Sequence, residues 1–296
     1  MNPAASQHEL PAERASPATL ERQFEIAVQR LADDLRFGFD ASPYLGSGVD
    51  YVQSRPYVSG DSAKDIDWKV TARTQRYHVK QYESLKSTPI YLIVDTSASM
   101  AVSSRPLSKY HLAVLLVGGL ALAGLRRLSP VGILAGGERS LHVEPSLSRP
   151  QVFLWLRQLR ECRYDERTQL GARLEQLSGH LVSRTFVVVI SDLHDAEAVR
   201  SIKRLAARHD CAAIQLQDPA EEGRLRGGLL RGVEAETGRA FVAHGRTRWF
   251  SGEEMQSAVE LRRAGVDHLL LSTAVPFVAP LRRFLRDRGG LTRNTR

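Results

Sequence analysis

The sequence is poor in the residues that crosslink, anchor or export a chain. It has two cysteines in 296 residues, Cys162 and Cys211, which are too few for a disulfide framework and lack the spacing of a zinc site. The longest apolar run, residues 112–125, is too short to cross a bilayer and suits a buried helix. The N-terminus lacks the apolar stretch of a secretory signal. We therefore expect a cytoplasmic protein without a membrane span.

Lysine is also scarce: six of the 41 basic residues are lysine, and the rest are arginine. The net charge of +8 is uneven, since residues 261–296 carry eight arginines against Asp267 and Asp287. An arginine-favouring base composition and a solvated C-terminal helix account for this excess. The alternative, a nucleic-acid footprint, would place aromatic side chains between the arginines, where this segment offers Phe277 and Phe284. We expect no nucleic-acid partner.

The composition is otherwise that of a globular protein, with 43% apolar and 25% charged residues, which excludes wholesale disorder and fibrous folds. After Pro89, apolar runs typical of buried strands alternate with segments of helical periodicity. This alternation predicts an α/β protein with a doubly wound, mostly parallel sheet of the Rossmann type. We expect strands over 90–95, 131–137, 140–145, 185–192, 211–218 and 268–273, and helices over 110–128, 150–159, 170–181, 196–208, 253–263 and 276–288.

Outside these elements the patterns are more varied. Apolar residues at three- and four-residue spacing predict an N-terminal helix over about 19–35. Residues 37–76 are polar and rich in turn formers, and we expect them to be irregular, before a strand over 77–83. Residues 229–243 are expected to form a hairpin. The predicted parts are a disordered N-terminus (1–18), the helix and irregular segment (19–88), the α/β domain (89–288) and a tail (289–296).

Oxygen-bearing side chains follow two of the predicted buried strands. Asp95, Ser97 and Ser99 come directly after one strand, Asp192 ends another, and Thr168 precedes a helix. Ligands of such sheets bind beyond the carboxyl ends of the strands, where these residues would meet. Hard cations prefer oxygen ligands. The spacing therefore predicts a Mg²⁺ site, with Mn²⁺ or Ca²⁺ as alternatives.

Other interpretations of these residues stay open. Ser99 and Thr168 each precede a stretch that forms a helix, where serine and threonine are favoured N-caps. Asp195, three residues beyond Asp192, is a rival second carboxylate. Capping and metal binding do not exclude one another.

The Asp95-x-Ser97-x-Ser99 motif, with Thr168 and Asp192 downstream, resembles the metal-ion-dependent adhesion site (MIDAS) of von Willebrand factor A-like domains. The resemblance implies that Ser97 and Ser99 touch Mg²⁺ directly and that Asp95 and Asp192 act mostly through water. It also implies that a partner's carboxylate fills the open metal position. Thr168 departs from the family pattern, because glycines often precede that threonine and this chain has Asp165-Glu166-Arg167.

A second motif lies upstream, where residues 55–73 read RPYVSGDSAKDIDWKVTAR. This resembles the signature of the DUF58 family, whose members carry such a block before a von Willebrand A-like domain. Asp218-Pro219 with Glu221 also looks like that family. The resemblance implies a short type without transmembrane helices, similar to accessory proteins of bacterial methanol-oxidation operons.

The residues of that block allow two interpretations. Its alternating charges predict an ion-pair network that fixes a long loop, with the tryptophan anchoring it by apolar burial. The alternative is a docking surface for a partner; a metal site on such spacing is disfavoured. The residues concerned are Arg55, Asp61, Asp65, Asp67, Trp68 and Arg73.

Together these features predict a non-enzymatic, metal-dependent protein-binding module. The DUF58 resemblance implies a MoxR-type AAA+ ATPase as partner, in a chaperone-like pair that assembles or activates a client protein offering an acidic residue. The alternative is a Mg²⁺-dependent phosphohydrolase or nuclease using Asp95 and Asp192. Against it, Ser97 stands where such a phosphohydrolase commonly has a second acid, and phosphate-binding loop motifs are missing.

Overall fold

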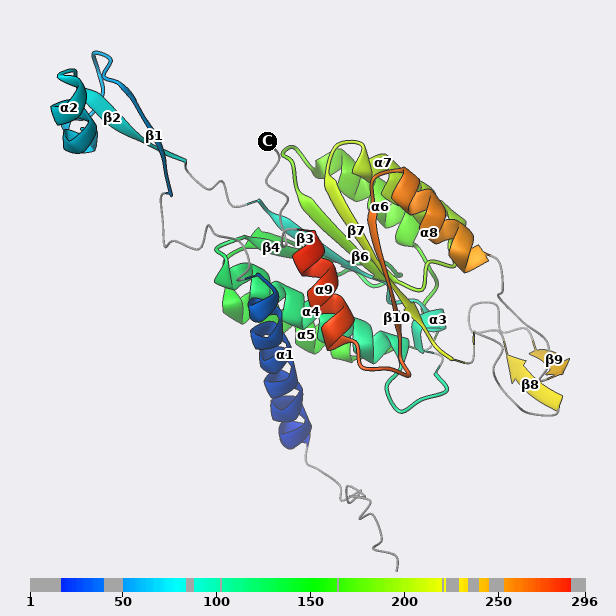
Figure 1. Cartoon of the computed structure of the whole chain (residues 1–296). Helices are drawn as coiled ribbons and strands as arrows, with labels where there is room; N and C mark the ends of the chain where they lie inside the picture. Colours follow the sequence, from blue (N-terminus) through cyan, green and yellow to red (C-terminus); the bar gives the residue numbers. More distant parts are fainter. Residues whose placement is uncertain are drawn as a thin grey trace, which may run out of the picture.

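The structure, a computed structural model, describes residues 17–39, 50–83, 88–101, 103–163, 165–219, 221, 229–233, 240–244 and 253–288. Its main body is a six-stranded sheet with helices on both faces, and Figure 1 shows these three layers. The predicted α/β architecture with a mostly parallel sheet is confirmed at this level. Of the expected disordered N-terminus 1–18, residues 1–16 lie outside the described residues, whereas residues 17 and 18 belong to a helix; the tail 289–296 also lies outside the described residues.

The order of the sheet explains where a ligand would bind. The strands are arranged β10-β7-β6-β3-β4-β5, all parallel except β5. The chain enters at β3, builds β4 and β5 on one side, and then builds β6, β7 and β10 on the other. The direction of winding therefore reverses between β3 and β6. The strands are β3 (Ile90–Val94), β4 (Val131–Ala135), β5 (His142–Ser146), β6 (Phe186–Ser191), β7 (Asp210–Gln217) and β10 (Asp267–Ser272).

The central strands are buried on both faces, as their unbroken apolar sequences predict. Because side chains alternate along a strand, the sheet divides the core into two clusters. Ile90, Leu92 and Val94 of β3 join one cluster, and Tyr91 and Ile93 join the other. Each helical layer is held to the sheet by one of these clusters.

The helices divide between the two faces accordingly. Helices α1 (Pro17–Phe39), α4 (Lys109–Arg126), α5 (Arg149–Arg160) and α9 (Val278–Asp287) contribute to the first cluster. Helices α6 (Leu170–His180), α7 (Ala196–Ala206) and α8 (Glu253–Arg263) cover the opposite face. Among the described helices, α4 is long and apolar enough to cross a membrane, but 78% of its apolar window is buried inside the fold. It serves here as the central helix of its layer.

Helix α1 packs across α4, and two glycines of α4 permit the close approach. A Cβ atom on Gly118 would lie 2.8 Å from Val28, and one on Gly119 would lie 2.6 Å from Cγ of Leu31. Val28, Leu31 and Leu35 are buried at this contact, on the apolar face that the sequence predicts. The glycine pair therefore serves helix packing.

Residues 50–83 form a unit of their own, which we call the signature unit, and Figure 1 shows it apart from the main body. Strands β1 (Asp50–Pro56) and β2 (His78–Glu83) pair antiparallel, with a 3₁₀ turn η1 (Ala63–Asp65), and α2 (Trp68–Thr74) between them. The expectation of an irregular segment over 37–76 is therefore wrong for β1 and α2. The strand β1 was hidden because it contains polar residues and ends in proline.

Every other predicted element is present. The strands and helices expected between residues 90 and 288 all form, with ends within two residues of the predicted positions. The hairpin is confirmed as β8 (Leu229–Val233) paired antiparallel with β9 (Ala240–His244). A short helix α3 (Ala98–Ala101) follows β3 and was not foreseen. The domain boundaries stay a prediction.

We predict that Gly119→Ala lowers the free energy of unfolding by up to about 2 kcal/mol. Overpacking a tight core costs about 1–3 kcal/mol, which is offset by a gain in helix propensity of about 1 kcal/mol; the 2.6 Å contact with Leu31 favours the upper end of the cost. Gly179→Ala on α6 is the matched control, because a Cβ there meets nothing within 4 Å. Denaturant titration of both variants tests this. Equal effects at the two glycines would show that the approach of α1 to α4 tolerates a methyl group.

We also predict a stability loss in acid that depends on His268 of β10. Burial, assisted by the charge of Arg262, lowers the pKa of His268 to about 4. The pKa of His268 in the folded protein lies below its value of about 6.5 in the unfolded chain. The stability linked to the neutral form of His268 is therefore fully present above about pH 6.5 and is lost as the pH falls toward 4. Wild type should lose about 3 kcal/mol more than His268→Gln between pH 7 and pH 4. Parallel pH profiles of the two proteins would contradict this.

Candidate functional site

Two buried carboxylates meet at the point where the sheet reverses. Asp95 follows β3 and Asp192 follows β6, and these strands are neighbours in the sheet. Asp95 is 2% exposed and Asp192 is 3% exposed. The backbone N–H of Asp95 donates to the carbonyl oxygen of Ile190 at 2.9 Å, which ties the two strand ends together. A switch point of this kind is the usual binding edge of an open α/β sheet.

The Asp95 carboxylate is held by groups from both strand ends. Ser191 Oγ donates to Asp95 Oδ2 at 2.7 Å, and the backbone N–H of Ser97 donates to Oδ1 at 3.0 Å. Burial and then the negative charge of Asp192 raise the pKa of Asp95 to about 6. The hydroxyl oxygens of Ser97 and Ser99 lie 3.0 Å apart. The tight turn after β3 thus carries the Asp95 carboxylate and both hydroxyls.

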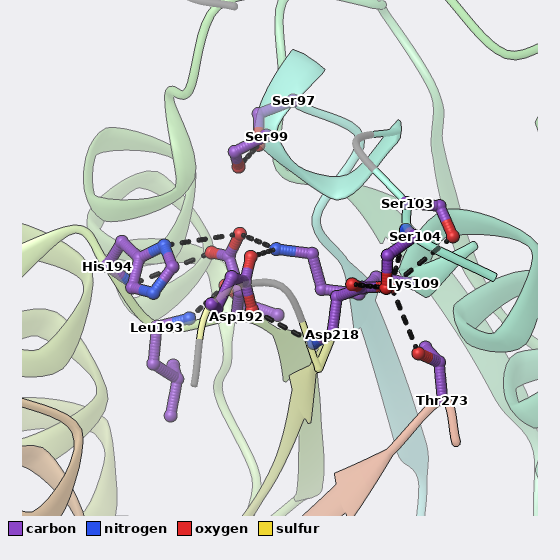
Figure 2. A network of polar contacts seen from close by, with 12 residues as sticks. Ser97, Ser99, Ser103, Ser104, Lys109, Asp192, Leu193, His194, Asp218 and Thr273 are labelled. Carbon is purple, nitrogen blue, oxygen red and sulfur yellow. Dashed lines mark hydrogen bonds and ion pairs between the residues drawn. The ribbon is translucent and has the colours of Figure 1, made fainter. Parts of the chain in front are cut away.

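The Asp192 carboxylate binds a buried lysine that the sequence analysis missed. Lys109 Nζ lies 2.9 Å from Asp192 Oδ2 and also pairs with Glu221, and the Lys109 side chain is fully buried. Burial alone would raise the pKa of Asp192, but the Lys109 ammonium, and next His194, hold it below its ordinary value. Figure 2 shows Lys109 and His194 on opposite sides of Asp192, with Ser97 and Ser99 lying together nearby.

The position of Lys109 carried a signal that could have revealed its role. It is the first residue of α4, directly after the N-cap Ser108. A positive charge at a helix N-terminus is unfavourable because the helix dipole is positive there. A buried lysine at that place therefore requires acidic partners, which Asp192 and Glu221 supply.

Glu221 is directed to Lys109 by a turn after β7. The backbone N–H of Asp218 donates to Glu221 Oε2 at 3.0 Å, which leaves Oε1 for Lys109. Asp218 itself is buried, and its carboxylate accepts bonds from the Ser104 N–H and the Thr273 hydroxyl, each at 3.1 Å. Figure 2 shows this second cluster beside Lys109. Residues 218 and 221, which supported the DUF58 resemblance, thus contribute to the same network.

The loop that carries Thr168 is fixed against the turn after β3. The Ala98 N–H donates to the Glu166 carbonyl at 2.8 Å, and the Thr96 hydroxyl donates to the Glu166 carboxylate at 2.7 Å. Arg139 binds the same buried carboxylate with Nε at 2.9 Å and Nη2 at 2.7 Å. Burial would raise the pKa of Glu166, but Arg139 lowers it below its ordinary value. Thr168, two residues on, is half-buried.

The capping explanation of the hydroxyl residues is wrong. Ser99 lies inside α3, which begins at Ala98, and Gln169 rather than Thr168 is the N-cap of α6. Asp195, the rival carboxylate, is the N-cap of α7 and accepts the Glu197 N–H at 2.8 Å. Asp192 is therefore the second carboxylate at the strand ends.

The charges at the site leave room for a cation. Asp95, Asp192 and Glu221, if ionised, contribute three negative charges, and Lys109 offsets one of them, so that a divalent ion would complete the balance. Hydroxyl and carboxylate oxygens are the donors that Mg²⁺ prefers. A second possible ligand group shares Asp192 and adds His194 and Glu221, with ligand atoms within 4.8 Å of one another. There, however, the Lys109 ammonium already binds both carboxylates.

The upstream block forms part of the ion-pair network that the sequence predicts. Arg55 binds Asp61 with two bonds of 2.8 and 2.7 Å. Asp67 is buried, accepts the Ser54 hydroxyl at 2.6 Å and is the N-cap of α2. Arg73 is exposed in the last turn of α2, and the side chain of Asp65 lies outside the described residues.

Trp68 differs from the prediction. We expected it to anchor the block by burial, but its side chain is 65% exposed, and this expectation is wrong. Asp67 and the Arg55–Asp61 pair hold the block together instead.

The fold and site define an α/β protein with carboxylates and hydroxyls gathered at the switch point of its sheet. A family model described as protein of unknown function DUF58 matches residues 53–257, and the chain belongs to this family. Uncharacterized proteins of Mycobacterium bovis and of two Mycobacterium tuberculosis strains are 28% identical over 286 residues, covering 91% of this chain and 90% of each relative. The crystal structure of an uncharacterized membrane-spanning protein from Vibrio fischeri aligns with a TM-score of 0.24 and 15% identity, covering 61% of this chain and 89% of that one.

We predict that Lys109→Met lowers the free energy of unfolding by about 3–5 kcal/mol in EDTA, the usual cost of leaving buried charges without their partner. Lys203→Met is the matched control, because Lys203 pairs with Glu260 at 3.0 Å on the surface. Breaking such an exposed pair costs less than about 1 kcal/mol. Denaturant titration measures both. If the two substitutions cost the same, Lys109 does not balance the site.

Proposed function

We propose that this chain is a metal-dependent protein-binding module without catalytic activity of its own. Ser97 and Ser99 would hold Mg²⁺ directly. Asp95 and Asp192 would hold it mostly through water, and Thr168 would complete the set. The ion would supply an open coordination position for a carboxylate of a partner protein. This is the MIDAS-like arrangement that the sequence resembles.

One observation carries the proposal: the Asp95 turn, with both hydroxyls, lies beside Asp192 at the switch point of the sheet. Both carboxylates are buried; Asp95 is bonded to Ser97 and Ser191, and Asp192 to Lys109, so they are held in place before any ion binds. Two buried like charges that interact, as Asp95 and Asp192 do, are unfavourable unless a cation offsets them. A divalent ion meets that need and leaves a position for the partner.

Two features disfavour an enzyme. Both oxygens of Asp95 accept hydrogen bonds, from Ser191 and from the Ser97 N–H, which reduces its value as a nucleophile. The residue two positions on is Ser97, which lacks the acidity of a general acid. The non-enzymatic module is therefore the better-supported function.

The partner follows from the family rather than from the site. We propose a MoxR-type AAA+ ATPase encoded in the same organism, acting with this chain to assemble or activate a client protein. The site itself requires only that a partner or client present an accessible aspartate or glutamate. An arginine-rich chain with a net charge of +8 would favour the approach of such an acidic surface.

The test is affinity capture from a native lysate, in Mg²⁺ and in EDTA, read by mass spectrometry. We predict that wild type retains an AAA+ ATPase or a client in Mg²⁺ and loses it in EDTA. The double variant Ser97→Ala with Ser99→Ala should retain neither protein, in Mg²⁺ or in EDTA. It removes the two direct metal ligands but keeps the hydrogen bond from the backbone N–H of residue 97 to Asp95. Asp95→Ala should behave in the same way. Ser140→Ala, an exposed serine outside the site, is the control.

Equal capture under all conditions would mean that partners bind elsewhere and that the strand-end site has a structural role. Turnover of a generic phosphate mono- or diester in Mg²⁺ or Mn²⁺, lost in Asp95→Ala, would replace this proposal by the enzymatic alternative.

A further inference from the structure

The signature unit exposes large apolar side chains that a small folded unit would ordinarily cover. Trp68 is 65% exposed, Tyr77 62%, Val58 61% and Tyr57 41%. We call these four residues the apolar patch. Single exposed apolar residues are common, but a group that includes a tryptophan and two tyrosines is typical of an interaction surface. In α2, which begins at Trp68, none of the residues is buried.

Backbone hydrogen bonds hold the segments that carry the apolar patch in a defined arrangement. The Tyr57 N–H donates to the Tyr77 carbonyl at 2.9 Å, and the Asp67 N–H donates to the His78 carbonyl at 2.8 Å. These bonds bring the Tyr57 and Trp68 segments to the same two residues at the start of β2. The Tyr57 and Tyr77 rings meet edge to face, with centroids 6.5 Å apart.

Within the signature unit, the acidic side chains that the structure describes are engaged in internal hydrogen bonds and ion pairs. Asp61 binds Arg55 through both oxygens and also accepts the Val58 N–H at 2.9 Å. Asp67 is buried and caps α2. Apart from Arg55, which pairs with Asp61, the basic side chains of the unit are exposed. The exposed ones are Lys64, Lys69, Arg73, Arg76 and Lys80.

We propose that the apolar patch, with these exposed basic residues, is a docking surface for an acidic protein segment that also carries apolar side chains. The charge pattern selects the class of partner, because the acids that the structure describes in this unit, Asp61 and Asp67, are internally bonded, whereas its exposed cations can face carboxylates. The surface includes no residue of the strand-end site, so this inference stands without the metal.

The geometry favours a protein over a single-stranded nucleic acid. Bases stack on the open faces of aromatic rings. Tyr57 and Tyr77 instead pack at an interplanar angle of 65°, so that one ring covers part of the other. Val58 adds an aliphatic contact that suits a leucine or phenylalanine side chain and offers a base no stacking. Tryptophan and tyrosine are also the residues that most often dominate protein interfaces.

The experiment pans a random 12-residue peptide display library on the full-length chain in EDTA, so that a metal site cannot contribute. We expect enriched peptides that combine aspartate or glutamate with aromatic or leucine residues. Synthetic copies of these peptides should bind at least 10-fold more weakly to Trp68→Ala and to Lys69→Glu with Arg73→Glu. Leu154→Ala and Arg200→Glu, at exposed positions of α5 and α7, should bind them as wild type does.

Enrichment of peptides without acidic residues, or equal binding by all variants, would overturn the proposal. Failure to enrich any peptide would also overturn it. Retention of a random single-stranded DNA pool by wild type, with this retention lost in Trp68→Ala, would overturn it as well and would identify a nucleic-acid surface. A second measurement checks the free surface itself. Acrylamide should quench the fluorescence difference between wild type and Trp68→Phe as it quenches an exposed tryptophan. Shielding of Trp68 in the free chain would show that the patch is covered by the protein itself and would also overturn the proposal.

Discussion

The burial of two like charges at one edge of the sheet is the constraint on which the site depends. Asp95 and Asp192 repel each other, and burial strengthens that repulsion because little water screens it. The chain answers with fixed groups: serine donors hold Asp95, and the Lys109 ammonium holds Asp192. The pKa values of the two carboxylates are consequently shifted in opposite directions: that of Asp95 is raised and that of Asp192 is lowered. These bonds keep the carboxylate oxygens of Asp95 and Asp192 in fixed positions, and the net negative charge of the site favours binding of a further cation.

The fold supplies that constraint through its winding. Because the chain reverses between β3 and β6, the helices that follow these two neighbouring strands, α4 and α7, pack on opposite faces of the sheet, and the turns after both strands meet at one edge. The Glu166–Arg139 pair then fixes the loop before α6 against this turn. Gly137 permits the contact, since a Cβ there would lie 2.3 Å from the Glu166 carboxylate and 2.5 Å from the Thr96 hydroxyl. Helix α4 contributes to both the core and the strand-end site. Its buried apolar residues pack on the sheet, and its first residue, Lys109, binds Asp192.

The sequence alone predicted most of the α/β body, because continuous apolar strands and amphipathic helices leave a strong periodic signal. It placed Asp95 and Asp192 together for the same reason, since each ends such a strand. It missed β1, where polar residues and a terminal proline obscure the alternation. It missed Lys109 because a charged residue beside an apolar run reads as a helix boundary, and its partners are 83 and 112 residues away. The burial of Trp68 was predicted wrongly because tryptophan is usually buried. The propensity of a single residue does not distinguish a core position from an interface position.

An interface based on the strand-end site alone would have little specificity. A metal ion accepts a carboxylate from almost any protein surface, and one such contact buries only a small part of the roughly 800 Å² per partner that a stable interface requires. Discrimination must come from additional area with its own chemistry. The signature unit offers this, because its internal Arg55–Asp61 and Asp67 bonds present apolar and basic side chains on a separate framework. If both proposed surfaces select acidic partners, one through a metal ion and one through side chains, together they would recognise a partner that neither would recognise alone.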